Sequence, residues 1–454
     1  MRLLRNCIEK CICVAKISFM RKLKRLIATT VALMLLTFGA NADLIGHGGM
    51  VRSVDVSADG VRVITGSFDY TARVWNFGDQ GEIAVLDLHE GPVTNVAFDP
   101  SGNLALTTGD DYLAIFWDLS TFKPIHRLAG HKHKVMAAAF APSGKIAATG
   151  SWDKTIKLWD LQGGKEIRTI AANSPVNAVV FSRDGKTLIS GGHHPLIQIW
   201  NLESGELAGK LEGHLMGVTA LSLSPDGKML LSASIDKSIR LWDLQENIEL
   251  RKIDVRDGQV YDVQFSPDGQ RALTAGKDGY VVEWNLSNGL PLHEIAAHER
   301  IAWAARYTPD GRFAVSASSD EQARIWHIET GDRIGQTQIA DAGPQPWLES
   351  DHPGAKLFTK CAKCHALSAD GPSRSGPHFA HLFNRKAGSI ENYRYSAALT
   401  GVQFRWDEKN LFRLFDEGPD KMLPGSKMPV QRVTDDKQLS DLVDYLRILT
   451  STGD

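Results

Sequence analysis

Residues 214–242 have the sequence HLMGVTALSLSPDGKMLLSASIDKSIRLW, in which alternating apolar residues flank Pro225-Asp226-Gly227. Such alternation, interrupted by a Pro-Asp-Gly turn, is typical of two short strands joined by a tight turn. The arrangement recurs along the chain, and its tryptophans are spaced by 41 or 42 residues: Trp75, Trp117, Trp159, Trp200, Trp242, Trp284 and Trp326. An Asp stands six positions before the Trp in every unit except the fourth, which has His194. The pattern predicts seven units of about four strands, none of which can bury its faces alone.

This repeat resembles the WD-repeat family, which implies that residues 43–339 form an all-β, seven-bladed propeller. In that family a His, a Ser or Thr two positions before the Asp, the Asp and the Trp form a hydrogen-bonded network within each blade. His214, Ser234, Asp236 and Trp242 match this set. The second, fourth and sixth units have glycine at the hydroxyl position, so we expect those blades to be held together less firmly. The glycines are Gly109, Gly192 and Gly276.

Closure of the ring has its own sequence signals. Residues 333–339 align with the outer strand of an earlier unit at residues 249–253. Residues 43–46 are all that precede the first repeat after the export signal described next, and they are too few for a full strand. We therefore expect the seventh blade to use its own outer strand, without an N-terminal one, and the seam between the first and seventh blades to be weak.

The N-terminal region, residues 1–42, has the features of an export signal. Met20 is followed by basic residues 21–25, an apolar run at 27–38 and the small residues Ala40-Asn41-Ala42. The apolar run has twelve residues, whereas a membrane-spanning helix needs about 20. We predict a signal peptide with Met20 as the true start and cleavage after Ala42, and therefore a periplasmic protein. An uncleaved membrane anchor is the alternative.

A linker rich in proline and glycine, residues 340–352, precedes helical sequence at 353–454. Cys361-Ala362-Lys363-Cys364-His365 is a Cys-x-x-Cys-His motif, typical of covalent attachment of one haem c, with the His as an iron ligand. Zinc is an alternative, but the predicted mature chain has no further cysteine to complete such a site. A dithiol exchanger, the other alternative, has no need of the following His.

Around this motif, residues 353–449 resemble class I cytochrome c, which implies an all-α domain. By this resemblance the Pro377 carbonyl accepts a hydrogen bond from His365, and Met428 is the second iron ligand, with Met422 as a competitor. The resemblance also places Arg385, Tyr395 and Trp406 at the haem propionates. The family has glycine where this chain has His381 and Asn384, so we expect either a different turn or an exposed imidazole at His381.

The net charges of the two regions limit the kinds of partner that the protein can bind. Residues 43–352 carry 28 basic and 40 acidic side chains, a net of −12, and residues 353–454 carry 15 basic and 12 acidic ones, a net of +3. An acidic bulk argues against nucleic acid as the partner. We expect no stable membrane insertion. The two resemblances together imply a periplasmic electron-transfer protein, not an enzyme, whose propeller docks protein partners and whose haem exchanges electrons with redox proteins. The alternatives are a haem-based redox or gas sensor, or a propeller oxidoreductase of the quinohaemoprotein type.

Overall fold

The computed structural model describes residues 43–255, 258–334, 346–362, 365–369, 376–391, 393, 395–424, 426, 428 and 432–451. The predicted signal peptide, residues 335–345 and Cys364 lie outside these ranges. No helix of the described residues is long and apolar enough to cross a membrane.

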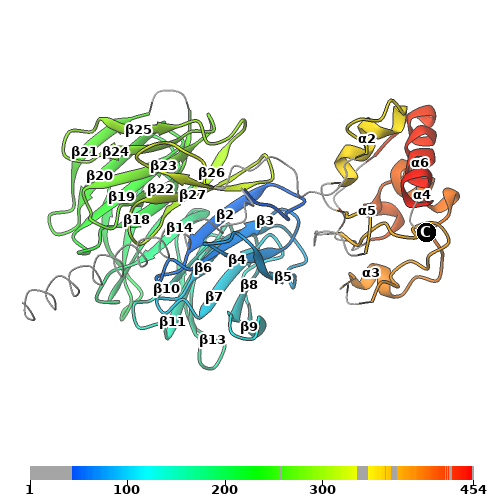
Figure 1. Cartoon of the computed structure of the whole chain (residues 1–454). Helices are drawn as coiled ribbons and strands as arrows, with labels where there is room; N and C mark the ends of the chain where they lie inside the picture. Colours follow the sequence, from blue (N-terminus) through cyan, green and yellow to red (C-terminus); the bar gives the residue numbers. More distant parts are fainter. Residues whose placement is uncertain are drawn as a thin grey trace, which may run out of the picture. The chain divides into compact units, whose positions relative to one another are not determined.

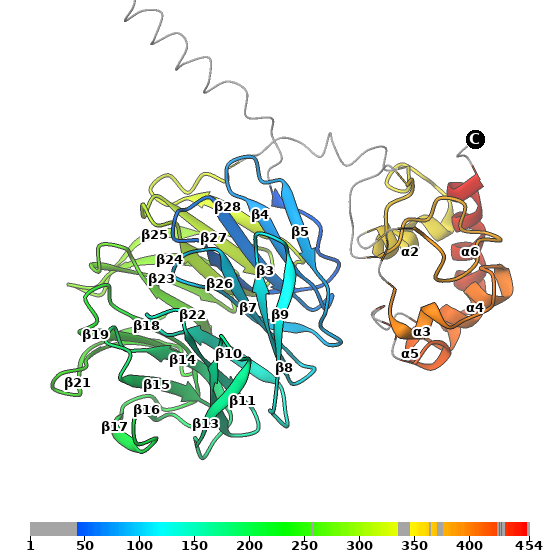
Figure 2. The same cartoon turned by 90° about the horizontal axis from the view of Figure 1, so that it is seen from below.

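Seven four-stranded antiparallel sheets form the predicted propeller (Figures 1 and 2). The first four blades contain β2 (Val51–Val56), β3 (Arg62–Ser67), β4 (Ala72–Asn76), β5 (Glu82–Leu86), β6 (Val93–Phe98), β7 (Leu104–Gly109), β8 (Leu113–Asp118), β9 (Lys123–Ala129), β10 (Val135–Phe140), β11 (Ile146–Ser151), β12 (Thr155–Asp160), β13 (Lys165–Ala171), β14 (Val176–Phe181), β15 (Thr187–Gly192), β16 (Ile197–Asn201) and β17 (Leu207–Leu211). The last three contain β18 (Val218–Leu223), β19 (Met229–Ser234), β20 (Ser238–Asp243), β21 (Ile248–Asp254), β22 (Val260–Phe265), β23 (Arg271–Gly276), β24 (Val281–Asn285), β25 (Pro291–Ile295), β26 (Ala302–Tyr307), β27 (Phe313–Ser318) and β28 (Ala323–His327).

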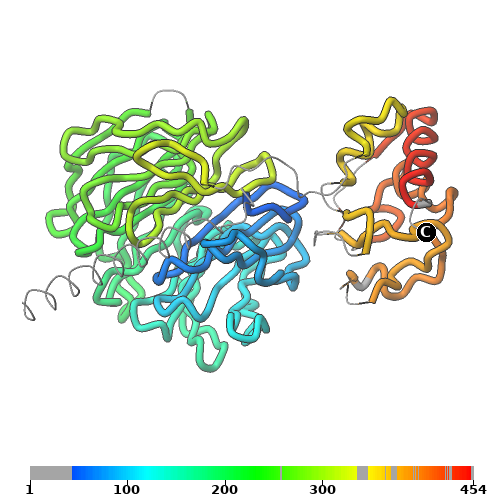
Figure 3. Tube along the Cα trace, viewed as in Figure 1, coloured from blue at the N-terminus to red at the C-terminus, as the bar shows by residue number. Residues whose placement is uncertain are grey.

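Local sequence explains the turns within a blade. Between β18 and β19, the Ser224 hydroxyl donates a hydrogen bond to Asp226 (2.6 Å), and Gly227 has a φ of 76°. Residues with a side chain rarely adopt that conformation, so the Pro-Asp-Gly sequence favours this turn. The chain passes from blade to blade in sequence order (Figure 3), and the first strand of each blade contacts the first strands of its neighbours.

The ring is closed by the N-terminal strand β1 (Asp43–Leu44), which pairs with β28 as the fourth strand of the seventh sheet. Our expectation that no N-terminal strand closes the ring is therefore wrong. Two residues suffice because Leu44 is completely buried and Asp43 forms an ion pair with Arg333. The backbone of Arg333 also forms an isolated antiparallel β-bridge with Trp326, on the same edge of β28. The other predicted outer-strand residues, 335–339, lie outside the described residues.

The C-terminal part is all-α, as predicted. Its helices are α2 (Pro353–Ala362), α3 (Ala397–Thr400), α4 (Glu408–Asp416), α5 (Pro419–Met422) and α6 (Asp436–Ser451). Gly354 allows α2 to approach α6 closely, because a Cβ there would lie 2.0 Å from the Asp441 carbonyl oxygen. Phe358 on α2 packs edge-on against Tyr445 on α6, with ring centroids 5.8 Å apart. The two helices thereby bring the end of α2, and Cys361 with it, onto the core of this domain.

Candidate functional site

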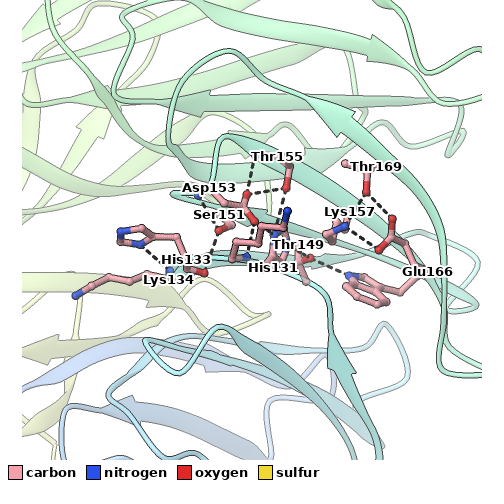
Figure 4. A network of polar contacts seen from close by, with 12 residues as sticks. His131, His133, Lys134, Thr149, Ser151, Asp153, Thr155, Lys157, Glu166 and Thr169 are labelled. Carbon is pink, nitrogen blue, oxygen red and sulfur yellow. Dashed lines mark hydrogen bonds and ion pairs between the residues drawn. The ribbon is translucent and has the colours of Figure 1, made fainter.

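The repeated His, Asp and Trp residues form a buried network within a blade. In the fifth blade, His214 contacts Asp236 through Nδ1 (2.9 Å) and the Ser232 hydroxyl through Nε2 (2.7 Å). The Trp242 indole N–H donates to the same Ser232 oxygen (2.8 Å). Figure 4 shows the equivalent network of the third blade around His131, Thr149 and Asp153. The network therefore ties β19 and β20, and the turn between them, to the segment that precedes β18.

The hydroxyl of this network is not the one that the resemblance implied. Ser232 lies two residues before Ser234, and Ser234 instead donates to the Gly217 carbonyl and accepts from the Asp236 N–H. Residues two apart on a strand point to the same face, so the strand pattern does not distinguish them. Gly109 in the second blade therefore removes no network member, because Thr107 bonds both His89 and Trp117 there.

The networks divide the blades differently from our prediction. Blades one, two, three, five and seven have the complete set, centred on His47, His89, His131, His214 and His298. In the fourth and sixth blades, only the bond from Trp to a hydroxyl is found among the described residues: Trp200 to Ser190 and Trp284 to Thr274. The second blade therefore keeps the network that we expected Gly109 to interrupt, and the fourth and sixth have incomplete networks.

Burial and hydrogen bonds set the pKa values of the histidine and the aspartate in this network. Burial lowers the pKa of His214, and the hydrogen bond to Asp236 offsets only part of this effect. Burial alone would raise the pKa of Asp236, but hydrogen bonds from Ser238, the Leu215 N–H and His214 outweigh it and lower the pKa to about 2. The contact between His and Asp, repeated in five blades, is a structural arrangement. Catalytic groups do not recur in every blade.

The haem-attachment motif lies at the end of α2. Cys361 is buried in the last turn, and the His365 N–H donates to its carbonyl oxygen (3.0 Å), so His365 stands one helical turn further on. Nδ1 of His365 is 2.6 Å from the Pro377 carbonyl oxygen. Because a carbonyl can only accept, Nδ1 carries the proton, and Nε2 keeps its lone pair for a metal.

Phe379 is a neighbour of this imidazole that the sequence analysis missed. Its ring stacks on that of His365 with centroids 4.4 Å apart and planes 15° apart. Phe379 also packs against Phe358 of the domain core. The only sequence signal was its position two residues after Pro377, since a single apolar residue in a loop does not indicate which side chain it covers.

Arg385 and Trp406 lie on adjacent segments, and the backbone N–H of Trp406 donates to the Arg385 carbonyl (2.9 Å). The Arg385 guanidinium donates to the carbonyls of Ala380 (2.5 Å) and His378 (2.9 Å). Burial lowers its pKa, which the nearby Tyr395 partly offsets. Among the described residues, no carboxylate forms an ion pair with this half-buried cation. Burial raises the pKa of Tyr395. Its hydroxyl oxygen accepts a hydrogen bond from the backbone N–H of Ile390 (3.3 Å).

Two further polar atoms indicate what this region holds. His378 Nδ1 and the Ser396 hydroxyl oxygen are buried and have no hydrogen-bond partner in the described part of the chain. Buried polar groups are usually satisfied, and the described part of the chain supplies no partner for these two atoms. A haem with two propionates matches this donor set: a cation without an acidic partner, two orphan polar atoms and the His365 lone pair. The residues present therefore fit a haem.

Both candidate thioethers border the same helical core. Met422 ends α5, and Met428 lies in the loop that follows, where its N–H donates to the Ser426 hydroxyl (3.2 Å). His381 and Asn384, which replace the family's glycines, keep left-handed backbone conformations with φ values of 52° and 68°. The turn is therefore retained, and the His381 imidazole is exposed.

The chain matches two family models. "WD domain, G-beta repeat" matches seven times, at residues 40–76, 81–118, 122–160, 164–201, 205–243, 249–285 and 289–327, which together are more than half of the chain. "Cytochrome c" matches residues 352–450.

Relatives match the C-terminal part. A cytochrome c homolog of Rickettsia typhi is 33% identical over 94 residues, which are 21% of this chain and 53% of that protein. The cytochrome c of Gibberella zeae is 39% identical over 95 residues, 21% of this chain and 89% of that protein. The cytochrome c of Stellaria longipes is 37% identical over 95 residues, 21% and 87% of the two chains. This chain thus spans about half the length of the Rickettsia relative. The matches show that the chain belongs to the WD-repeat family and carries, after its seven repeats, a cytochrome c domain with a covalently bound haem c.

Proposed function

We propose that this protein is a periplasmic, monohaem electron carrier that does not act as an enzyme. In this proposal, Cys361 and Cys364 attach the haem, and His365 and Met428 are its two iron ligands. The propeller docks a protein partner close to the redox centre. The predicted signal sequence in residues 1–42 supports export, since haem is attached to Cys-x-x-Cys-His motifs outside the cytoplasm in the bacterial systems that this chain resembles.

The observation that carries the proposal is the short contact between His365 Nδ1 and the Pro377 carbonyl (2.6 Å). It holds the proton on Nδ1, fixes the plane of the imidazole and raises the basicity of Nε2, as partners of metal-bound histidines do. The stacked Phe379 ring limits rotation of the imidazole. When bound, haem supplies a one-electron Fe(II)/Fe(III) couple.

The remaining residues bind and shield the cofactor. Arg385 supplies the cation for a propionate, and the Tyr395 and Ser396 hydroxyls supply donors beside it. Leu411, Leu414 and Phe415 on α4 belong to the buried core and exclude water. If His365 and Met428 both ligated the haem iron, no coordination position would remain for a substrate. This arrangement supports electron transfer rather than catalysis.

The axial pair is tested with Met428→Ala in the full-length holoprotein, with Met422→Ala as the matched control. Loss of the thioether ligand should abolish the weak long-wavelength absorption band that marks an iron–sulfur(Met) bond, and should lower the reduction potential. Met422→Ala should keep both. If only Met422→Ala removes the band, Met422 is the ligand. If the oxidised parent protein lacks the band and the reduced protein binds carbon monoxide readily, a haem-based sensor replaces the electron carrier.

Export is tested by fractionating cells that express the chain with and without residues 1–42. The full chain should give red holoprotein in the periplasm, starting at Asp43, and the shortened chain should give colourless protein in the cytoplasm. Holoprotein from the shortened chain, in cells without a cytochrome c maturation system, would contradict the proposal.

A further inference from the structure

The residues that immediately precede α2 pack on the core of the cytochrome domain. The sequence assigned residues 340–352 to a linker, but Trp347 and His352 contact rings of that core. Trp347 lies edge-on to Phe358, with ring centroids 5.3 Å apart and planes 64° apart. His352 stacks on Tyr445, with centroids 5.1 Å apart and planes 25° apart. The linker end, residues 346–352, is therefore part of the cytochrome structure.

The linker end also begins helix α2. His352 Nδ1 accepts a hydrogen bond from the backbone N–H of Gly354 (3.1 Å), and the His352 carbonyl oxygen accepts one from the N–H of Ala355 (2.9 Å). The first turn of a helix leaves such N–H groups without a partner in the helix, so His352 satisfies two of them. The placement of α2 therefore depends on the residues before it as well as on its packing against α6 (Figure 1).

A row of ring contacts runs from the linker end to the haem-attachment motif. Phe358, which Trp347 contacts, is completely buried, and its ring centroid is 6.0 Å from that of Phe379. Phe379 is 8% exposed and stacks on the His365 imidazole, with centroids 4.4 Å apart. We call these four residues the ring row. Packed aromatic pairs stabilise one another beyond the area that they bury, so each ring holds the next.

The position of Phe379 matters because two contacts set the plane of the His365 imidazole. One is the hydrogen bond from Nδ1 to the Pro377 carbonyl (2.6 Å), and the other is the stacked Phe379 ring. Phe379 lies outside the helices, and its N–H donates to the Ala366 carbonyl (2.8 Å). A side chain orients a metal ligand only when its own packing fixes it. Phe358 supplies that packing from α2, and Trp347 covers Phe358 from the linker end.

We infer that Trp347 is a positioning residue for the iron ligand His365 and acts on it through Phe358 and Phe379. This inference rests on the proposed function, in which His365 binds the iron, and extends the redox centre into the linker. A histidine ligand becomes more basic when its other ring N–H donates to a carbonyl. Loosening of the ring row would weaken that hydrogen bond and lower the basicity of Nε2. A less basic ligand stabilises Fe(III) less, so Fe(II) would be favoured.

The test is Trp347→Ala in the full-length holoprotein. The variant should raise the ratio of Fe(II) to Fe(III) at a fixed ambient potential about threefold, which is about 30 mV for a one-electron couple. It should also speed the exchange of the His365 Nδ1 proton with deuterium oxide about tenfold, followed by NMR of the reduced protein, because the hydrogen bond opens more often. The matched control is Leu348→Ala, since Leu348 is the next residue and is 63% exposed. This control should behave like the parent in both measurements.

Rescue separates positioning from a general effect on stability. Trp347→Phe keeps an aromatic ring on Phe358 and should restore both the potential and the exchange rate toward the parent values. If Trp347→Ala yields too little holoprotein, Trp347→Leu takes its place, because it keeps an apolar side chain without a ring. An unchanged potential and exchange rate, even with a loss of stability, would overturn the inference. So would equal changes in Leu348→Ala, or no recovery in Trp347→Phe.

The NMR spectrum of the reduced parent distinguishes this inference from the proposed function. A haem shifts the signals of an imidazole bound to its iron. If the parent lacks such shifted signals for His365, the proposed ligation fails. If the parent shows them and Trp347→Ala still behaves like the parent, only the positioning role of Trp347 fails.

Discussion

The histidine networks of the propeller differ from the polar residues around Arg385 in the cytochrome domain in where their partners come from. In the propeller, the buried imidazole of His214 finds both of its partners, Asp236 and Ser232, within its own blade. In the cytochrome domain, His378 Nδ1 and the Ser396 hydroxyl have no partner in the described chain, and Arg385 has no acidic partner there. Buried atoms without a partner among the described residues also occur in the propeller, at Arg73, Arg240 and Trp303, so the difference lies in the histidines. The propeller histidines find their partners within the blade, whereas the residues around Arg385 fit a haem.

This difference predicts how each region responds to damage. The propeller repeats one network in five blades, so the loss of one network leaves the others in place. The cytochrome domain has a single centre, and its helices α2, α4 and α6 pack into one core around it. A cofactor that binds only the folded state contributes its binding energy to folding.

The largest expected effect follows removal of the haem. In Cys361→Ala/Cys364→Ala, no thioether bond forms, and the orphan polar atoms near Arg385 remain buried without partners, at a cost of about 1–3 kcal/mol each. We expect hydrogen exchange, followed by mass spectrometry on the full chain, to show loss of protection in α2 and α6 and unchanged protection in the propeller strands. Protection retained in α2 and α6 would show that this core forms without haem.

A smaller effect is expected at the seam of the ring. Leu44 is completely buried in β1, so Leu44→Ala should lower the free energy of unfolding of the propeller by about 2–5 kcal/mol. The adjacent Ile45 is 58% exposed, and Ile45→Ala should change it by less than about 0.5 kcal/mol. Denaturant titrations that follow tryptophan fluorescence measure both variants, and the haem spectrum should stay the same. Equal effects of the two substitutions would mean that β1 does not hold the ring closed.

The smallest expected effect is the response of the propeller to mild acid. Burial lowers the pKa of His131, His214 and His298 below the value of 6.5 that is normal for an unfolded chain. Below about pH 6.5, the unfolded chain therefore binds protons that the folded propeller does not, and stability should fall as the pH falls. Denaturant titrations at a series of pH values measure how steeply the free energy of unfolding changes with pH.

His214→Gln is the control for that slope, because it removes one of the three histidines. The variant should be less stable near neutral pH, and its stability should change less steeply as the pH falls. A slope identical to that of the parent would show that His214 is not a source of the pH dependence.

Sequence reasoning was most accurate where the signal is local or periodic. The spacing of Trp75 and its equivalents predicted seven blades, and Cys361 with His365 predicted the haem domain, both of which the family matches bear out. It was wrong about the network hydroxyl by two residues, because Ser232 and Ser234 share a face of β19 and only Ser232 lies within reach of both His214 and Trp242.

Contacts between residues far apart along the chain were decided by the tertiary structure alone. Asp43 meets Arg333 only because the ring brings the two ends of the propeller together, and no sequence period records that meeting. Phe379 covers His365, and Tyr112, His133 and Trp152 line up across blades, for the same reason. A repeat encodes the conformation of each unit through its own turns and alternation. Which side chains meet across units depends on how the units pack in space, and that is a property of the folded chain.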